Sequence, residues 1–246
     1  MNHLSPFEAT SEQHVQGPSA WAESIVDEYE LISVADHALF VELGAAPVDL
    51  GKIWLLMANL ATGISRDFVI WLAQTIARVD DPRIASLLAK QLNDELGDGS
   101  FTQIHSRLLE RFVRGLEPWR PRDSDEALVL EPGRRLARRG CHLFTTSRTY
   151  EAVGALMVGE VFAKKMDHCV GDEIRRQNAL GEEVLTWLTL HETLEVDHAD
   201  DSRLLASLVP HTHTALAECR VGAASFWQYL WDFLDGVHGV ANRHPS

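Results

Sequence analysis

The chain has few cysteines, no signal-type start and no long apolar run, and these shortages exclude several classes of protein. Its three cysteines, Cys141, Cys169 and Cys219, are odd in number and lack the paired spacing of a zinc site, so we expect reduced thiols in a cytoplasmic protein. The segment from Met1 to Gly17 contains no lysine or arginine, which is unlike a signal or transit peptide. The apolar run Ile53–Leu60 is too short to span a membrane. The sequence therefore predicts a protein without a disulfide framework or a membrane segment.

Basic residues are also scarce. The chain contains 22 lysines and arginines against 36 aspartates and glutamates, which gives a net charge of −14. This balance, with no basic stripe, argues against a nucleic-acid partner. Hydrophobic residues make up 46% of the 246 positions, so the chain has enough apolar material for a sizeable core.

Sustained apolar–polar alternation, the mark of a strand, is missing as well, and nearly every segment shows the apolar period of a helix. We predict helices over residues 19–43, 50–79, 81–115 (with a disturbance at 97–100), 133–145, 147–176, 182–208 and 214–240, with residues 118–132 as a loop. No internal repeat or long linker divides the chain. The pattern therefore predicts an all-α bundle of about seven helices, with residues 1–18 as a flexible N-terminal segment and residues 19–246 as one domain.

The most informative motif lies in the predicted helix 182–208. His191, Glu195 and His198 follow one another with the spacing His-x3-Glu-x2-His, and residues three, four and seven apart share one face of a helix. Two imidazoles and a carboxylate form a mixed nitrogen and oxygen set that suits iron, manganese or zinc. The alternative is a solvated polar face.

A second pair of candidate ligands stands in the predicted helix 81–115. Glu95 and His105 are ten residues apart, so they lie roughly 80° away from a common face in an ideal helix. Gly97 and Gly99 lie between them and supply a local break that turns both side chains inward. The alternative is a glycine interruption with surface acids.

The third candidate, Glu160, is a single carboxylate in a run of small and apolar residues. A carboxylate buried in such a run needs a cation or a metal. Lys164, four residues later, offers the simpler explanation of a helical ion pair.

Together these positions supply three carboxylates and three histidines, which is about the inventory that two carboxylate-bridged irons require. A zinc hydrolase needs only three protein ligands and would leave the others unexplained. The six candidate metal ligands are Glu95, His105, Glu160, His191, Glu195 and His198.

This ordered set resembles the haem-oxygenase-like diiron oxidases, relatives of the thiaminase-II and pyrroloquinoline-quinone synthase proteins. The matching pieces are Asn93-x-Glu95-x-Gly97 with His105, then Glu160 in its apolar helix, then the motif that begins at His191. The resemblance spans most of the chain. One departure is that the family usually has aspartate at the position of Glu195, and the longer side chain puts the stability of a second iron in doubt.

The resemblance implies a bundle of about seven helices that holds two ferrous ions per chain and uses dioxygen to oxidise a small molecule, in specialised biosynthesis. It also implies an external electron donor and a homodimer. Members N-oxygenate amines, or fragment or desaturate amino acids and fatty acids. Asp67, in the apolar helix 50–79, matches the region from which N-oxygenating members draw an extra carboxylate ligand, and slightly favours amine N-oxygenation here. A surface contact of Asp67 with a lysine or arginine is the alternative.

The same resemblance assigns catalytic roles to the metal-binding carboxylates Glu95, Glu160 and Glu195. Lys164, Arg148 and Tyr150 are candidate anchors for a substrate carboxylate, although each suits a solvated helix position equally well.

Two other functions stay open. A metal-free enzyme on the same fold, such as a thiaminase-II-like hydrolase or a cofactorless oxidase, would need an activated nucleophile such as cysteine. Neither Cys141 nor Cys169 stands in a convincing constellation, and buried cysteine is often simply a small apolar residue. A non-enzymatic helical binding protein would leave the histidines and carboxylates solvated and bind no iron.

Overall fold

The computed structural model of the chain describes residues 22–45, 49–121, 125–177 and 180–243, without the side chains of residues 177, 183 and 192–200. The expected flexible segment 1–18 lies outside these ranges. Throughout the described ranges the regular structure is helical, with no strand, which confirms the all-α fold. The α-helices are α1 (Glu23–Glu30), α2 (Ala38–Leu43), α3 (Leu50–Leu60), α4 (Phe68–Ile76), α5 (Pro82–Glu95), α6 (His105–Gly115), α7 (Glu126–Val129), α8 (Glu131–Thr146), α9 (Thr149–Gln177), α10 (Glu182–Leu208) and α11 (His213–Arg243).

Three short segments of other helical types connect them. Segments η2 (Val34–Asp36) and η4 (Glu117–Trp119) are 3-10 turns, and η3 (Ala61–Ser65) is a π-helix between α3 and α4. The described residues thus form more helices than the seven expected, because the predicted helices 19–43, 50–79 and 81–115 are each interrupted. The predicted loop 118–132 was also wrong in part, since α7 and the start of α8 occupy it.

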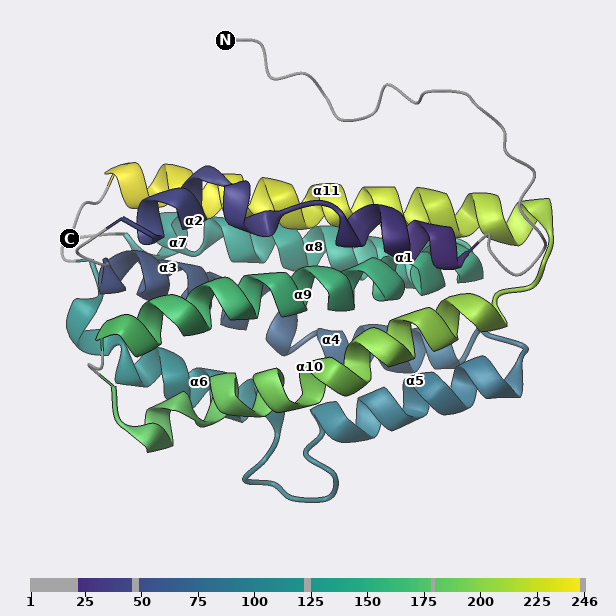
Figure 1. The fold of residues 1–246 in the computed structure, drawn as a ribbon, viewed down its shortest axis with the longest axis horizontal. Helices are drawn as coiled ribbons and strands as arrows, with labels where there is room; N and C mark the ends of the chain where they lie inside the picture. Colours follow the sequence, from purple (N-terminus) through teal and green to yellow (C-terminus); the bar gives the residue numbers. More distant parts are fainter. Residues whose placement is uncertain (1–21, 46–48, 122–124, 178–179, 244–246) are drawn as a thin grey trace, which may run out of the picture.

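Helix α9 crosses the centre of the view in Figure 1, with α11 and α8 on one side and α10, α5 and α6 on the other. It packs most extensively against α11 and α10. Glycines make the contact with α11 very close, since a Cβ at Gly222 would overlap the carbonyl oxygen of Glu151, and one at Gly154 would overlap that of Cys219. Small residues at a crossing let two helix backbones approach each other, and this contact fixes the position of α9.

A second close contact holds α3 to α8. Asn59 is fully buried, and its amide donates to the carbonyl oxygens of Leu55 and Val129 at 2.9 and 3.0 Å. Its side-chain oxygen accepts a hydrogen bond from the backbone N–H of Gly133 at 2.9 Å. The buried amide is therefore satisfied on every side, and it anchors the helix that leads into the π-helical segment η3.

The segment Leu50–Ile76 is long and apolar enough, by length and composition alone, to cross a membrane. The sequence analysis considered only the uninterrupted run Ile53–Leu60 and did not identify this longer segment. The share of its most apolar stretch that is buried inside the protein is 56%, and Trp71 and Leu72 belong to the core. Its composition fits a core helix, because an element surrounded by other helices is apolar on most faces.

Candidate metal centre and cavity

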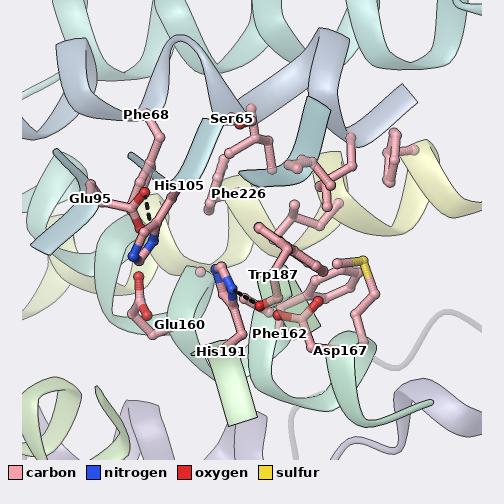
Figure 2. A pocket seen from close by; sticks show the side chains of 18 residues that line it. Ser65, Phe68, Glu95, His105, Glu160, Phe162, Asp167, Trp187, His191 and Phe226 are labelled. Carbon is pink, nitrogen blue, oxygen red and sulfur yellow. Dashed lines mark hydrogen bonds and ion pairs between the residues drawn. The ribbon is translucent and has the colours of Figure 1, made fainter. Parts of the chain in front are cut away.

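A cavity of about 110 Å³ lies between η3, the adjoining ends of α5 and α6, and helices α9, α10 and α11. Four of the predicted ligands, Glu95, His105, Glu160 and His191, line it. Figure 2 shows Glu95, His105 and Glu160 grouped on one side of the cavity, with His191 beside them. The other lining residues are Leu60, Ile64, Ser65, Phe68, Leu109, Gly159, Phe162, Ala163, Met166, Asp167, Trp187, Phe226, Leu230 and Phe233.

The sequence brings Glu95 and His105 together by ending one helix and starting another. Glu95 is the last residue of α5, and His105 is the first residue of α6. The turn after Glu95 is a Schellman motif, in which the N–H of Asp98 bonds to the carbonyl of Asn93 and that of Gly97 to Asp94. Gly97 takes a φ of +83°, which favours glycine. The expected glycine break is therefore present.

Across this break, His105 Nδ1 lies 3.2 Å from Glu95 Oε2. The His105 side chain is 5% exposed and that of Glu95 14%. The geometry between them is not that of a hydrogen bond, and the buried Nδ1 atom has no hydrogen-bond partner among the described residues. A buried nitrogen that faces a carboxylate without a hydrogen bond is a site that a cation would satisfy.

His191 is held in one tautomer by the backbone of its own helix. Its Nδ1 atom lies 2.9 Å from the carbonyl oxygen of Trp187, and because a carbonyl only accepts, Nδ1 carries the proton and the lone pair is on Nε2. The ring lies 4.9 Å from the His105 ring and 4.2 Å from the Trp187 ring, measured between centroids. Metal-binding histidines commonly have their second nitrogen fixed in this way.

Glu160 projects from α9 into the same group. The side-chain amide of Gln91, in α5, donates a hydrogen bond to Glu160 Oε1 at 2.5 Å. Glu160 is half-buried, whereas Lys164, one helical turn later, is exposed and does not line the cavity. The carboxylate is thus oriented by a neutral donor from the neighbouring helix.

The predictions for Glu195 and His198 lie outside the described side chains. The backbone of α10 is helical from Glu182 to Leu208 without interruption, as the spacing of the motif requires. Within the described side chains, no three histidine, cysteine, aspartate or glutamate residues lie close enough together to hold one metal ion.

Four further predicted residues do not line the cavity: Asp67, Arg148, Tyr150 and Lys164. Asp67 is half-buried and directly precedes α4, between the lining residues Ser65 and Phe68. Arg148 is exposed and pairs with Glu218 at 3.4 Å. Tyr150 is partly buried, and burial raises the pKa of its hydroxyl.

The structure therefore does not bring the candidate substrate anchors Lys164, Arg148 and Tyr150 to this cavity. The physical reason is helical phase. Ala163 and Asp167 line the cavity from α9, and Lys164 lies on the outward side of the same turns.

Three lining or supporting residues were missed by the sequence analysis. Gln91 lies one turn before Glu95, and Asp167 lies two turns after Glu160, so helical spacing from the recognised carboxylates would have found both. Trp187 similarly lies one turn before His191.

The donor chemistry of the residues present suits iron. Glu95, His105, Glu160 and His191 offer two carboxylates and two imidazoles to one end of the cavity, and iron binds this mixture of oxygen and nitrogen donors. The unsatisfied nitrogen of His105 and the fixed tautomer of His191 are the features that favour a metal there.

Comparison with known proteins gives one family and a consistent fold. A family model described as "Iron-containing redox enzyme" matches residues 59–231. A CADD-like protein of unknown function from Nostoc punctiforme has a similar structure, with a TM-score of 0.67 and 12% identity, covering 93% of this chain and 99% of that one. A TenA homolog from Pseudomonas syringae pv. tomato also has a similar structure, with a TM-score of 0.67 and 15% identity, covering 95% of this chain and 99% of that one. No curated protein matches the chain.

Proposed function

The chain belongs to the iron-containing redox enzyme family, and on this premise we propose that it is a diiron oxidase or oxygenase that uses dioxygen to oxidise a small molecule. Its fold is the haem-oxygenase-like all-α fold that the sequence predicted. The observation that carries the proposal is the convergence of four ligand-type side chains on one end of a cavity whose other lining residues are mostly apolar.

Each of these residues has a part in the proposal. Glu95, His105, Glu160 and His191 hold iron at the cavity end, and Glu195 and His198 complete the ligand set for two ions. Iron, when bound, supplies the electrons that activate dioxygen. Gln91 holds the Glu160 carboxylate in place through its hydrogen bond, and the backbone carbonyl of Trp187 keeps the His191 lone pair on Nε2.

The apolar lining supports an oxidation that excludes water. Twelve of the lining residues are apolar or glycine, among them Phe162, Phe226 and Phe233. Where an apolar lining excludes water, the electrostatic interactions of the few polar groups are stronger and a reactive centre is protected from side reactions. Dioxygen and a small organic substrate suit such a space.

The cavity suits more than one type of oxidation. Amine N-oxygenation, C–C cleavage and desaturation are the reactions to test, with an external electron donor that returns iron to the ferrous state and a homodimer as the assembly. The preference for N-oxygenation rested on Asp67, which does not line the cavity, so Asp67 as an extra ligand also stays a prediction.

A metal-free enzyme based on a cysteine nucleophile has less support. None of Cys141, Cys169 and Cys219 lines the described cavity. Burial raises the pKa of Cys219 to about 12 and also raises that of Cys169. A thiol with a raised pKa is a weak nucleophile near neutral pH.

The test is to load the iron-free protein with ferrous ions under anaerobic conditions, remove free metal and record dioxygen uptake. We expect uptake that is proportional to bound iron. Equal uptake by the iron-free protein would support a cofactorless oxidase, and absence of both bound iron and uptake would favour a metal-free enzyme or a binding protein.

A further inference from the structure

The cavity has a second polar position, away from the four ligand-type residues. Asp167 lines the cavity and is only 2% exposed. It lies two turns beyond Glu160 in α9, which corresponds to roughly 10 Å along the helix axis. In Figure 2 the ring of His191 lies between Asp167 and the group of Glu95, His105 and Glu160. Asp167 therefore belongs to a different part of the cavity from these three residues.

The charges around the cavity are of one sign. Its lining contains carboxylates and imidazoles but, within the described part of the chain, no lysine or arginine. The nearby Lys165 is committed elsewhere, because its ammonium group donates to the carbonyl of Glu30 at 2.7 Å. A substrate carboxylate brought into this part of the cavity would lose its hydration without meeting a protein cation, which is costly. A substrate ammonium group would meet the Asp167 carboxylate.

From this arrangement we propose that the cavity binds a small apolar amine and that Asp167 binds its ammonium group. The inference rests on the proposed function, since it names the class of substrate for the same cavity. An ammonium–carboxylate contact is strong where water is excluded, and the net charge of −14 draws cations towards the protein.

The remaining lining residues define the apolar part of the substrate. Five of them are aromatic, and aromatic faces attract both apolar groups and cations. The cavity of about 110 Å³ is of the same order as an apolar cavity of about 150 Å³ that holds one benzene molecule. The substrate skeleton is therefore one ring or a short chain. The aromatic residues are Phe68, Phe162, Trp187, Phe226 and Phe233.

This mode of binding also orients the substrate. An ammonium group at Asp167 points the other end of the molecule towards Glu95 and Glu160, because these residues lie on the opposite side of His191 (Figure 2). A substrate with a single nitrogen would then present carbon to the iron end. Oxygenation at nitrogen would require a second amino group at that end.

Calorimetric titration of the iron-free protein at neutral pH tests the proposal without requiring catalysis. The probes are benzylamine, benzyl alcohol and phenylacetate, which have similar size but carry a positive, a neutral and a negative group. We expect benzylamine to bind at least tenfold more tightly than the other two. In D167N this advantage should be lost, with the affinity for benzyl alcohol unchanged.

The matched control is D172N, which removes the same charge from α9 at a position that is 52% exposed and does not line the cavity. This variant should keep the preference for benzylamine. If D167N does not fold, the three probes on the wild-type protein decide the question. Equal affinities for the three probes, no binding of benzylamine, or an unchanged preference in D167N would overturn the proposal. Because iron is absent, each result is independent of whether the protein is a diiron oxidase.

Discussion

At the scale of single residues, the protein holds its four described ligand-type side chains by different means. His191 is fixed through its own helix by the carbonyl of Trp187, Glu160 through Gln91 of a neighbouring helix, and Glu95 and His105 by the ends of two helices. Because these supports are separate, replacing one ligand should leave the others in place. Single substitutions can therefore distinguish metal binding from a structural role.

His191→Ala should abolish iron-dependent dioxygen uptake while leaving the helical circular dichroism unchanged. The residue is half-buried at the cavity, and apolar packing along α9, α10 and α11 holds the bundle without it. Uptake and circular dichroism of the same preparation measure both effects. His142→Ala is the control, because His142 is exposed on α8 and does not line the cavity. Unfolding of H191A would instead indicate a structural role for this histidine.

Glu160→Gln should lower iron retention at least tenfold, with the apo melting temperature level or slightly raised. The substitution keeps size and hydrogen bonding to Gln91 but removes the charge that neutralises iron, and it relieves a partly buried carboxylate in the metal-free state. Glu151→Gln, on the same helix and outside the cavity lining, should change neither quantity. A lower melting temperature with full iron retention would remove Glu160 from the site and favour the ion pair with Lys164.

His37 gives the protein a pH-sensitive contact at a position that does not line the cavity. Its Nδ1 atom accepts from the N–H of Leu39 at 3.1 Å, which caps α2, and its Nε2 atom lies 3.1 Å from Asp235 Oδ1. Burial holds the pKa of His37 below its usual value, against the opposing effect of Asp235. A lowered pKa means that the fold favours the neutral ring. This stabilisation is complete above about pH 6.5, the unfolded value, and is lost as the pH falls through the folded pKa.

We therefore expect a fall in the free energy of unfolding between neutral and mildly acidic pH that is smaller in His37→Asn. Asparagine caps a helix but does not titrate in this range. Urea unfolding of both proteins at several pH values measures the difference. Identical pH dependence of the two proteins would show that His37 does not contribute.

At the scale of elements, the break between α5 and α6 determines the position of two ligands. Gly97 has a φ of +83°, and a Cβ there would lie 2.5 Å from the carbonyl oxygen of Ser100. Gly99 has a similar φ of +80° but open space around it. Replacing each glycine by alanine therefore distinguishes the free-energy cost of the backbone conformation, which both positions share, from the cost of a steric clash, which only Gly97 has.

Gly97→Ala should destabilise the protein by more than the roughly 1–2 kcal/mol that a left-handed conformation costs an alanine, and it should also weaken iron binding. Gly99→Ala should cost only that conformational amount and leave iron binding intact. Urea unfolding and iron retention measure both variants. Equal destabilisation of the two would show that the close approach at Gly97 does not hold the break.

The same elements show which features of the fold can be read from sequence. The apolar period predicted α10 with the bounds it has, and the helix predicted to start at residue 81 begins there as α5, where Asp81 is the N-cap and accepts from the N–H of Arg83. The breaks before α2 and α4 were missed. One depends on the His37 ring as a helix cap and the other on the π-helical turn of η3, and a strong apolar period continues through both.

The part of the candidate site that depends on residue spacing along helices could be predicted from the sequence. The order of Glu95, His105, Glu160 and His191 indicated residues that the structure brings to one cavity. The substrate anchors could not be identified in the same way. Arg148 and Lys164 carry the expected charge, but whether such a residue faces the cavity depends on the rotation of each helix in the bundle.

At the scale of the whole molecule, the segment Leu50–Ile76, α9, α10 and α11 enclose one cavity whose ligand-type residues come from α5, α6, α9 and α10. Two consecutive pairs of helices, α5 with α6 and α9 with α10, therefore meet at the proposed metal. A ligand that binds only the folded state stabilises it, so iron should raise the melting temperature of the wild-type protein. The increase should be absent in Glu95→Gln, which removes one charge at the helix break.

The most direct measurement of the central claim is the iron content of the protein after anaerobic loading with excess ferrous ions and removal of unbound metal. We predict about two irons per chain in the wild-type protein, because six candidate ligands fit two sites with open positions. Retention should fall sharply in both His105→Ala and His191→Ala, which lose the two histidines that line the cavity. A wild-type protein that retains no iron, or variants that retain as much as the wild type, would contradict the assignment of this cavity as a diiron centre.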